Sequence, residues 1–225
     1  MNASLLTPPL QEVSLDPTQI QQKVNGIIDE LMASLPEPQQ MTSEERRGMI
    51  ARYTAVLEGN FIYWMTACLL SVKAEDAKPI LLDNLNEEIR DAHPVMLRNF
   101  AIAAHAFPTD ADALAVNDDL NKVRRFLGRL SGVQTVLTMG FFESFIQKFM
   151  DPLAKLAIAQ GSTDMEYTDV HGVCDIAHSQ GLFMALSAEM ALNPMAPDAD
   201  LYEGVHLLRN LIKTIINGGA DKAAA

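Results

Sequence analysis

Hydrophobic residues recur at intervals of three and four along most of this sequence, which is the spacing of one face of an α-helix. The first such segment starts at Asp16 and Pro17, an N-cap residue followed by proline at the first helical position, and continues to residue 31. A second starts at Thr42 and Glu45, which fit a capping box, and keeps the pattern to residue 69. The chain therefore begins with two predicted helices.

The same spacing predicts helices over most of the remaining chain. The expected segments cover roughly residues 75–90, 93–105, 112–130, 132–149, 151–160, 164–191 and 197–217. Pro94 stands where the fourth helix would begin, so we expect a bend between the third and fourth helices rather than a loop. The 12 Gly and 11 Pro are few and gather at the ends of segments.

These segments predict an all-α fold, a single-domain bundle of seven to nine helices over residues 16–217. Neither an internal repeat nor a linker divides the chain, and a hydrophobic content of 48% is enough for a well-filled core. Residues 1–15 lack the helical pattern and are expected to form a flexible N-terminal arm, and residues 218–225 a flexible tail.

The charge of the chain limits its partners. The sequence has 29 Asp and Glu against 17 Lys and Arg, a net charge of -12, so we expect no nucleic acid and no membrane as partner. Cys68 and Cys174 lie far apart in helical segments and are expected to be free thiols. With no signal peptide in the N-terminal residues and no run of 18 apolar residues, we predict a cytoplasmic protein.

The segment DVHGVCDIAHSQG, residues 169–181, places three metal-binding side chains in a predicted helix. His171, Asp175 and His178 follow one another at steps of four and three, so they project within about 60° of one another and can share a metal. Imidazole and carboxylate together suit iron or manganese. A solvated polar stripe is the commoner explanation of such a motif on its own.

Other helices carry carboxylates that do not suit a core. Glu58 and Glu143 each lie among bulky apolar residues, where a buried carboxylate needs a cation. The segment NLNEEIRDAHP adds Glu87, Glu88 and His93 at the predicted bend. One carboxylate from each of several helices, together with His-containing pairs, is how helical bundles hold two iron or manganese ions.

In this order the residues resemble the haem-oxygenase-like diiron oxidases and oxygenases, a non-haem family. Its ligands are a Glu on one helix, a Glu followed by a His at a bend, a Glu on a later helix, and an HxxxDxxH motif. Glu88 is preferred to Glu87 because the NLxxE spacing matches the family and adjacent helical residues diverge by about 100°. The resemblance thus implies seven metal ligands in this sequence: Glu58, Glu88, His93, Glu143, His171, Asp175 and His178.

The resemblance also implies a function. It implies a haem-oxygenase-like bundle without haem that binds two Fe ions, with Mn as an alternative, and activates O2. The expected reaction is oxidation of a small-molecule substrate in biosynthesis, an amino acid or amine, by N-oxygenation or by C–C or C–N cleavage. The alternatives are oxidative decarboxylation or desaturation of an aliphatic acid, and a cofactor-free or non-enzymatic member of the same fold. Because the family includes many dimers, we expect a homodimer.

Substrate contacts are predicted from position alone. Tyr167 lies one turn before His171 on the same stripe, where it can touch substrate or simply pack in the core. Phe61 and Phe142 belong to a predicted apolar wall that would keep water away from the metals. Cys174 is expected to pack rather than to bind metal, and no catalytic residue is predicted beyond the metal ligands.

Overall fold

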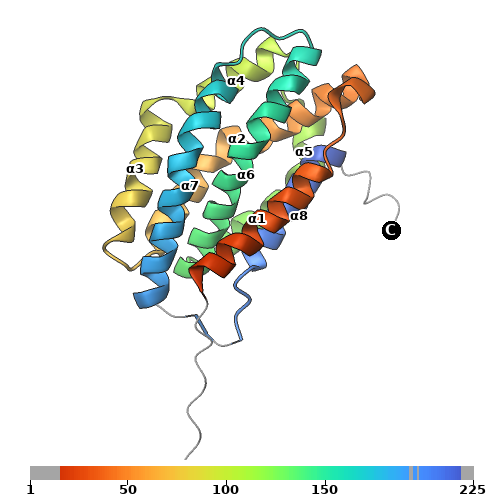
Figure 1. Ribbon diagram of the computed structural model, residues 1–225. Coiled ribbons are helices and arrows are strands. Elements are labelled where there is room, and N and C mark those ends of the chain that lie inside the picture. Colours follow the sequence, from red (N-terminus) through yellow and green to blue (C-terminus); the bar gives the residue numbers. More distant parts are fainter. Residues whose placement is uncertain (1–15, 193–194, 197, 219–225) are drawn as a thin grey trace, which may run out of the picture.

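Eight α-helices and one short 3-10 helix follow one another along the residues that the computed structural model describes, which are 16–192, 195–196 and 198–218. No strand occurs in these ranges, and the helices pack into one bundle (Figure 1). The prediction of an all-α fold with seven to nine helices is confirmed. The helices are α1 (Pro17–Ala33), α2 (Ser43–Ser71), α3 (Ala77–Arg90), α4 (His93–Ala103), α5 (Asp110–Leu127), α6 (Gly132–Ala159), α7 (Glu166–Leu192) and α8 (Glu203–Asn217), with the 3-10 helix at Pro38–Gln40.

Local side chains start the first two helices where the sequence predicted. The Asp16 carboxylate accepts a hydrogen bond from the Thr18 N–H at 2.9 Å, and Thr42 and Glu45 form a reciprocal capping box. Such caps satisfy N–H groups that have no partner within the helix. The predicted N-terminal arm, residues 1–15, lies outside the described residues, as do 219–225 of the predicted tail; Gly218 ends α8 with a left-handed φ of 65°.

The predicted break between residues 149 and 151 is wrong. Helix α6 continues through Pro152 to Ala159, although proline leaves the carbonyl group of Lys148 without its helical partner. The residues around Pro152 explain this continuity: Phe149, Met150 and Leu153 are all buried in the core. Packing of these apolar side chains outweighs the lost hydrogen bond, and the two predicted helices are one.

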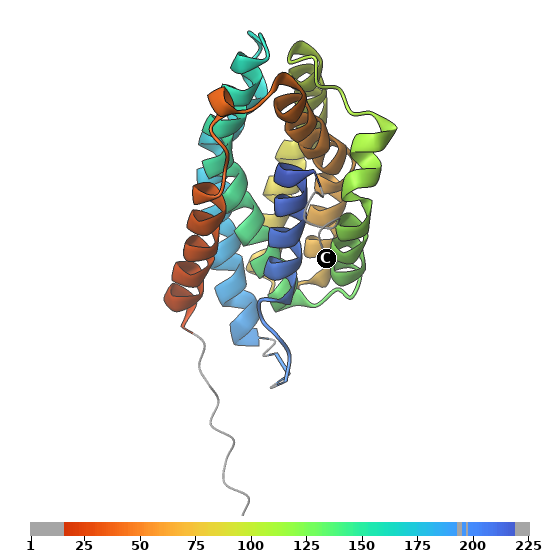
Figure 2. The same ribbon diagram turned by 90° about the vertical axis from the view of Figure 1, so that its right-hand side faces the viewer.

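Helix α7 is central to the arrangement. It packs along the length of α6 and also contacts α3 and α4, so it lies between these elements (Figures 1 and 2). Helix α2 contacts α3, α4, α5, α6 and α8, and its buried residues extend over nearly its whole length. The interior face of α7 is therefore enclosed by helices from both the first and second halves of the chain.

Both ends of α7 are tied to α2 or to the residues that follow it. In the first turn of α7, the hydroxyl of Tyr167 shares a 2.9 Å hydrogen bond with that of Tyr53 in α2. In the last turn, the carboxylate of Glu189 accepts hydrogen bonds from the backbone N–H groups of Lys73 and Ala74 at 2.8 and 2.9 Å. These contacts hold the two ends of α7 by interactions that need no metal.

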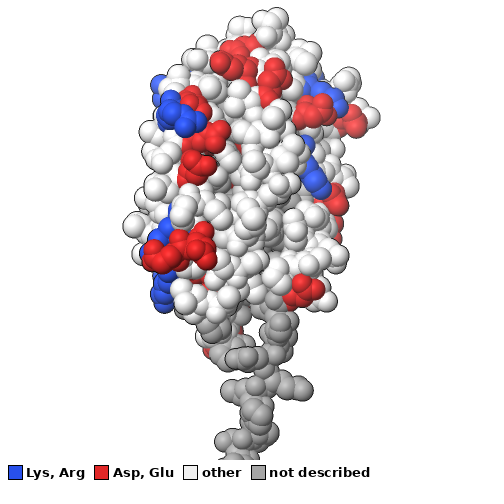
Figure 3. Space-filling model, turned by 60° about the vertical axis from the view of Figure 1, so that its left-hand side comes forward, with Lys and Arg blue, Asp and Glu red and all other residues white. Residues whose placement is uncertain are grey.

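The surface has no large basic area on the side where α3 lies. On that side, Figure 3 shows acidic side chains in several clusters, basic side chains next to them, and a broad uncharged area between. Pairs such as Lys78 with Glu75 and Arg90 with Asp91 account for such neighbours. None of the described helices combines the length and the apolar character that a membrane span requires.

A glycine sets the approach of α3 to α7. A Cβ atom at Gly181 would lie 2.9 Å from Cγ2 of Ile80 in α3, which is closer than Cβ atoms pack. On the same helix, a Cβ atom at Gly172 would lie 3.9 Å from its nearest neighbour, Cβ of Met150, an ordinary contact. The hydrogen atom at Gly181 therefore allows the two helices to lie this close.

We expect Gly181→Ala to lower the free energy of unfolding by about 1–3 kcal/mol, because the added methyl group overpacks the α3–α7 contact. Gly172→Ala is the matched control and should raise it by up to about 1 kcal/mol, the gain in helix propensity. Urea denaturation measures both values. Removing Cγ2 with Ile80→Ala in the Gly181→Ala background should recover part of the loss; equal values for the two single variants would contradict this account.

Candidate metal centre

Three of the predicted ligands come from α7 and share its buried face. His171, Asp175 and His178 are only 4%, 1% and 5% exposed, although they are polar. The spacing of four and three residues brings them onto one side of the helix, against α3, α4 and α6. The alternative of a solvated polar stripe is therefore wrong for this motif.

The predicted bend places two further ligands opposite α7. Glu88 lies in the last turn of α3 and His93 is the first residue of α4. Between the helices, Ala92 has a left-handed φ of 54°, a conformation that is costly for a residue with a Cβ atom. Such strain is often found at functional sites, and here it turns His93 back toward Glu88.

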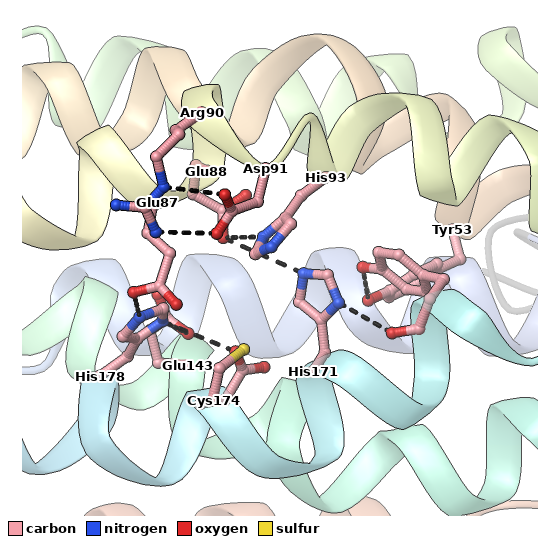
Figure 4. Close-up of polar contacts among 12 residues, drawn as sticks. Tyr53, Glu87, Glu88, Arg90, Asp91, His93, Glu143, His171, Cys174 and His178 are labelled. Carbon is pink, nitrogen blue, oxygen red and sulfur yellow. Dashed lines mark hydrogen bonds and ion pairs between the residues drawn. The ribbon is translucent and has the colours of Figure 1, made fainter.

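Glu88, His93 and His171 form one group, which we call the inner group (Figure 4). Nδ1 of His93 donates a 2.8 Å hydrogen bond to Glu88. Nδ1 of His171 donates to the carbonyl oxygen of Tyr167 at 2.8 Å, so its lone pair is on Nε2. That lone pair lies 4.0 Å from a Glu88 carboxylate oxygen, too far for a hydrogen bond.

Glu87, Glu143, Cys174, Asp175 and His178 form a second group, the outer group. Nε2 of His178 donates to Glu87 at 3.0 Å, while its Nδ1 lies 3.9 Å from Glu143 and 3.7 Å from Asp175. The Cys174 thiol donates to the Asp175 carboxylate at 3.2 Å. In Figure 4 the labelled members of this group lie beside those of the inner group.

Glu87 and Glu88 both contact a histidine of the centre, whereas the sequence predicts only Glu88 there. Glu88 is buried and contacts His93. The side chain of Glu87 is 32% exposed and accepts the hydrogen bond from Nε2 of His178. The two carboxylates diverge as expected from the helix geometry, and each contacts a different histidine, Glu88 contacting His93 and Glu87 contacting His178.

Three buried polar atoms of the outer group have no hydrogen-bond partner: Oε1 of Glu143, Oδ2 of Asp175 and Nδ1 of His178. The chain satisfies a buried carboxylate elsewhere, because Glu189 is equally buried and accepts backbone hydrogen bonds. Since Nε2 of His178 donates to Glu87, Nδ1 is the ring atom that faces the carboxyl groups of Glu143 and Asp175. A cation among these atoms would satisfy all three, and their donor types fit a first-row metal ion.

The pKa values of the centre also indicate that a nearby positive charge would be favourable. Burial raises the pKa of Glu143 well above its ordinary value, and the charges of Asp175 and Glu88 raise it further. Burial also raises the pKa of Asp175 to about 8. Burial, helped by the charge of His93, lowers the pKa of His171 to about 3, so this imidazole is neutral and can bind a metal.

Glu58 is not brought to the other predicted ligands. Its carboxylate accepts a 2.6 Å hydrogen bond from Nε of Arg98 on α4 and remains partly exposed. The neighbouring residue Leu57, with Phe61 one turn further on, faces the centre instead, and adjacent residues of a helix differ by about 100°. The idea that Glu58 is a buried carboxylate in need of a metal is wrong, because Arg98 supplies its partner.

A narrow pocket adjoins the inner group. Leu57, Phe61, Leu97 and Ile146 line it together with the metal-binding side chains and Tyr167, and it has room for about one water-sized molecule. Phe142 lies behind Phe61, with ring centroids 5.9 Å apart. Of the three predicted substrate contacts, Phe61 and Tyr167 thus line the pocket, whereas Phe142 packs in the core.

A wider groove lies between α3 and α7, and three members of the outer group, Glu87, Cys174 and His178, line it. It has a volume of about 550 Å³, within the range of small-molecule sites, and its lining includes Asp83, Glu87, Cys174 and His178. No Lys or Arg is among the described residues that line it. Four basic residues near the motifs in sequence each pair with an acidic residue outside the groove: Arg90 with Asp91, Arg98 with Glu58, Lys148 with Asp29, and Lys155 with Asp151.

Comparison with known proteins assigns no family. A scan against protein-family models finds no match for this chain, and a search of the curated proteins finds none. The fold and the site define the class directly: an all-α bundle whose interior holds buried His, Glu and Asp side chains that can bind a metal. Of the seven predicted ligands, Glu88, His93, Glu143, His171, Asp175 and His178 lie together in the bundle and Glu58 does not, whereas Glu87 and Cys174, which were not predicted as ligands, lie beside them.

We expect the metal-free protein to lose stability as the pH rises from about 6.5 to 8. The folded pKa values of Asp175, Glu143 and His93 are raised, for His93 because the hydrogen bond and charge of Glu88 outweigh the effect of burial. Their contribution is fully present below the unfolded pKa values and is lost as the pH passes the folded ones. His171, with a lowered pKa, opposes this trend only below its unfolded value of 6.5.

Urea denaturation of metal-free protein at pH 6.5 and pH 8 measures this loss. Asp175→Asn should have a smaller pH dependence, since the amide cannot titrate. Asp83→Asn on the exposed side of α3 is the control and should behave like the wild type. A stability that rises over this interval would contradict the proposed protonation of the centre.

Proposed function

We propose that this protein is a non-haem enzyme that binds two iron ions and uses O2 to oxidise a small metabolite. The observation that carries the proposal is the set of three buried, unpartnered donor atoms on Glu143, Asp175 and His178. Their arrangement is unfavourable without a cation, because burial removes these atoms from water and no hydrogen bond replaces the lost contacts. A cofactor-free or non-enzymatic role leaves that cost unexplained.

Two groups of donors support two ions rather than one. Glu88, His93 and His171 would hold one ion, and Asp175, His178 and Glu143, with Glu87 beside them, would hold the second. When bound, the two iron ions would supply the electrons that reduce O2; manganese suits the same donors. Glu58 is not needed for this ligand set.

The protein's own residues would orient the ligands and exclude water. The carbonyl oxygen of Tyr167 fixes His171 with its Nε2 toward Glu88, and Glu87 fixes His178 with its Nδ1 toward Asp175. Leu57, Phe61 and Leu97 form the apolar side of the pocket at the inner group, which has room for a molecule of about the size of O2.

The groove at the outer group supports an amino acid or amine as substrate. Asp83 and Glu87 line it without a basic residue among its described lining, so a protonated amino group would find opposite charge there. The reaction would be N-oxygenation or oxidative C–C or C–N cleavage, in the cytoplasm. The second candidate is oxidative decarboxylation or desaturation of an aliphatic acid, whose chain would lie in the same groove against Pro79, Ile80 and Ala177, because the pocket at the inner group is too small for it. The homodimer stays a prediction.

Iron content after anaerobic reconstitution tests the ligand set. Wild-type protein should bind about two Fe²⁺ per chain. Glu143→Gln and His178→Ala should bind fewer, because each removes a donor of the outer group. Glu58→Gln is the matched control on α2 and should keep the wild-type content, since Glu58 pairs with Arg98. Loss of iron in Glu58→Gln, or none bound by a folded wild type, would contradict the proposal.

O2 consumption by the Fe²⁺-loaded protein tests the activity and separates the two substrate classes. We expect consumption that depends on a compound from a panel of amino acids and amines, and a decrease by about 100-fold or more in Glu143→Gln. Consumption with aliphatic acids alone would select the second candidate. An iron-loaded wild type that consumes no O2 with any compound of either panel would overturn the enzyme assignment.

A further inference from the structure

We propose that Cys174 is a thiolate ligand of the outer metal position, so that the two positions of the centre differ in their choice of metal. The inner group offers only imidazole and carboxylate donors, whereas the outer group adds sulfur. This inference rests on the proposed metal centre. It also reverses the expectation that Cys174 only packs in the core.

The helix itself brings the sulfur to the site. Cys174 and His178 are four residues apart, so their side chains are neighbours on one face of α7. Ligand atoms of Cys174, Asp175 and His178 all lie within 4.8 Å of one another. A metal ion placed among them therefore needs adjustment of side chains and no rearrangement of the backbone.

Two further atoms point to a ligand at this place. Nδ1 of His178 and Oδ2 of Asp175 have no hydrogen-bond partner, and their residues are only 5% and 1% exposed. The sulfur of Cys174 lies 3.2 Å from the other oxygen of the same Asp175 carboxylate. The thiol thus adjoins a buried pair of donors that nothing else in the described chain satisfies.

The groove between α3 and α7 gives this position access to solvent. Cys174 and His178 both line it, whereas Glu88, His93, His171 and Glu143 line the narrow pocket. An ion can enter through the groove, and the proton of the thiol can leave by the same route when the thiolate forms. Each ion bound at the outer position displaces this one proton to water.

Thiolate favours softer ions, and carboxylate with water favours harder ones. The outer position should therefore prefer Zn²⁺, Co²⁺ or Fe²⁺ to Mn²⁺ and Mg²⁺, more strongly than the inner position does. Cys68 offers an internal comparison: it is fully buried in the core, and no metal-binding group among the described residues includes it.

Cobalt titration of the metal-free 225-residue chain tests the proposal, because a thiolate ligand of Co²⁺ gives a sulfur-to-metal charge-transfer band in the near ultraviolet. We expect the band in the wild type and in Cys68→Ala and its loss in Cys174→Ala. Visible ligand-field bands report bound cobalt whether or not sulfur is a ligand. Circular dichroism shows whether each variant folds.

Alkylation by iodoacetamide, followed by mass spectrometry, gives a second measurement that needs no variant. Bound cobalt should slow alkylation of Cys174 by about tenfold or more, because a ligated thiolate is a poor nucleophile. Cys68 should react only after unfolding in both forms.

The outcomes separate this inference from the proposed function. If the wild type binds cobalt without the near-ultraviolet band, or if the band persists in Cys174→Ala, the thiolate ligand is overturned and the His and carboxylate centre stands. An unchanged alkylation rate of Cys174 in cobalt-loaded protein likewise overturns the thiolate ligand. If the folded wild type shows no ligand-field bands, the metal centre and this inference fail together.

Discussion

The burial of several carboxylates together, with no Lys or Arg among them, is the constraint on which the rest of this structure depends. Glu88, Glu143 and Asp175 lie in the interior, and each raises the cost of ionising a neighbour. Elsewhere the chain pairs or caps its acidic groups: Glu58 has Arg98, and Glu189 has two backbone N–H groups. Among the described buried carboxylates, oxygens without a hydrogen-bond partner occur only on Glu143 and Asp175, where three histidines converge.

The centre has two sides with different surroundings. The inner group and Glu143 line a narrow, mostly apolar pocket, whereas Glu87, Cys174 and His178 line a wider acidic groove. Under the proposed function, the narrow pocket would hold O2 and the groove would hold the substrate. Ala92 and Gly181 maintain this arrangement, since one turns α4 back toward α3 and the other allows α3 to lie close to α7.

The periodicity of the sequence was enough to predict the helices and the buried face of α7, because spacing along a helix determines which side chains share a side. It could not predict the rotation of α2 about its axis, which points Leu57 rather than Glu58 at the centre. Nor could it predict the reach of Glu87 to His178, which depends on the distance between two helices. The break expected near Pro152 failed because tertiary packing overrides local preference.

The attachment of α7 at Tyr167 and Glu189 separates the contacts that hold this helix in the fold from the side chains that would bind metal. Hydrogen bonds at its two ends stabilise the fold, and the proposed metal ligands lie between those ends. An ion can then leave or be exchanged while the hydrogen bonds of Tyr167 and Glu189 stay in place. The bundle need not come apart for its centre to be emptied.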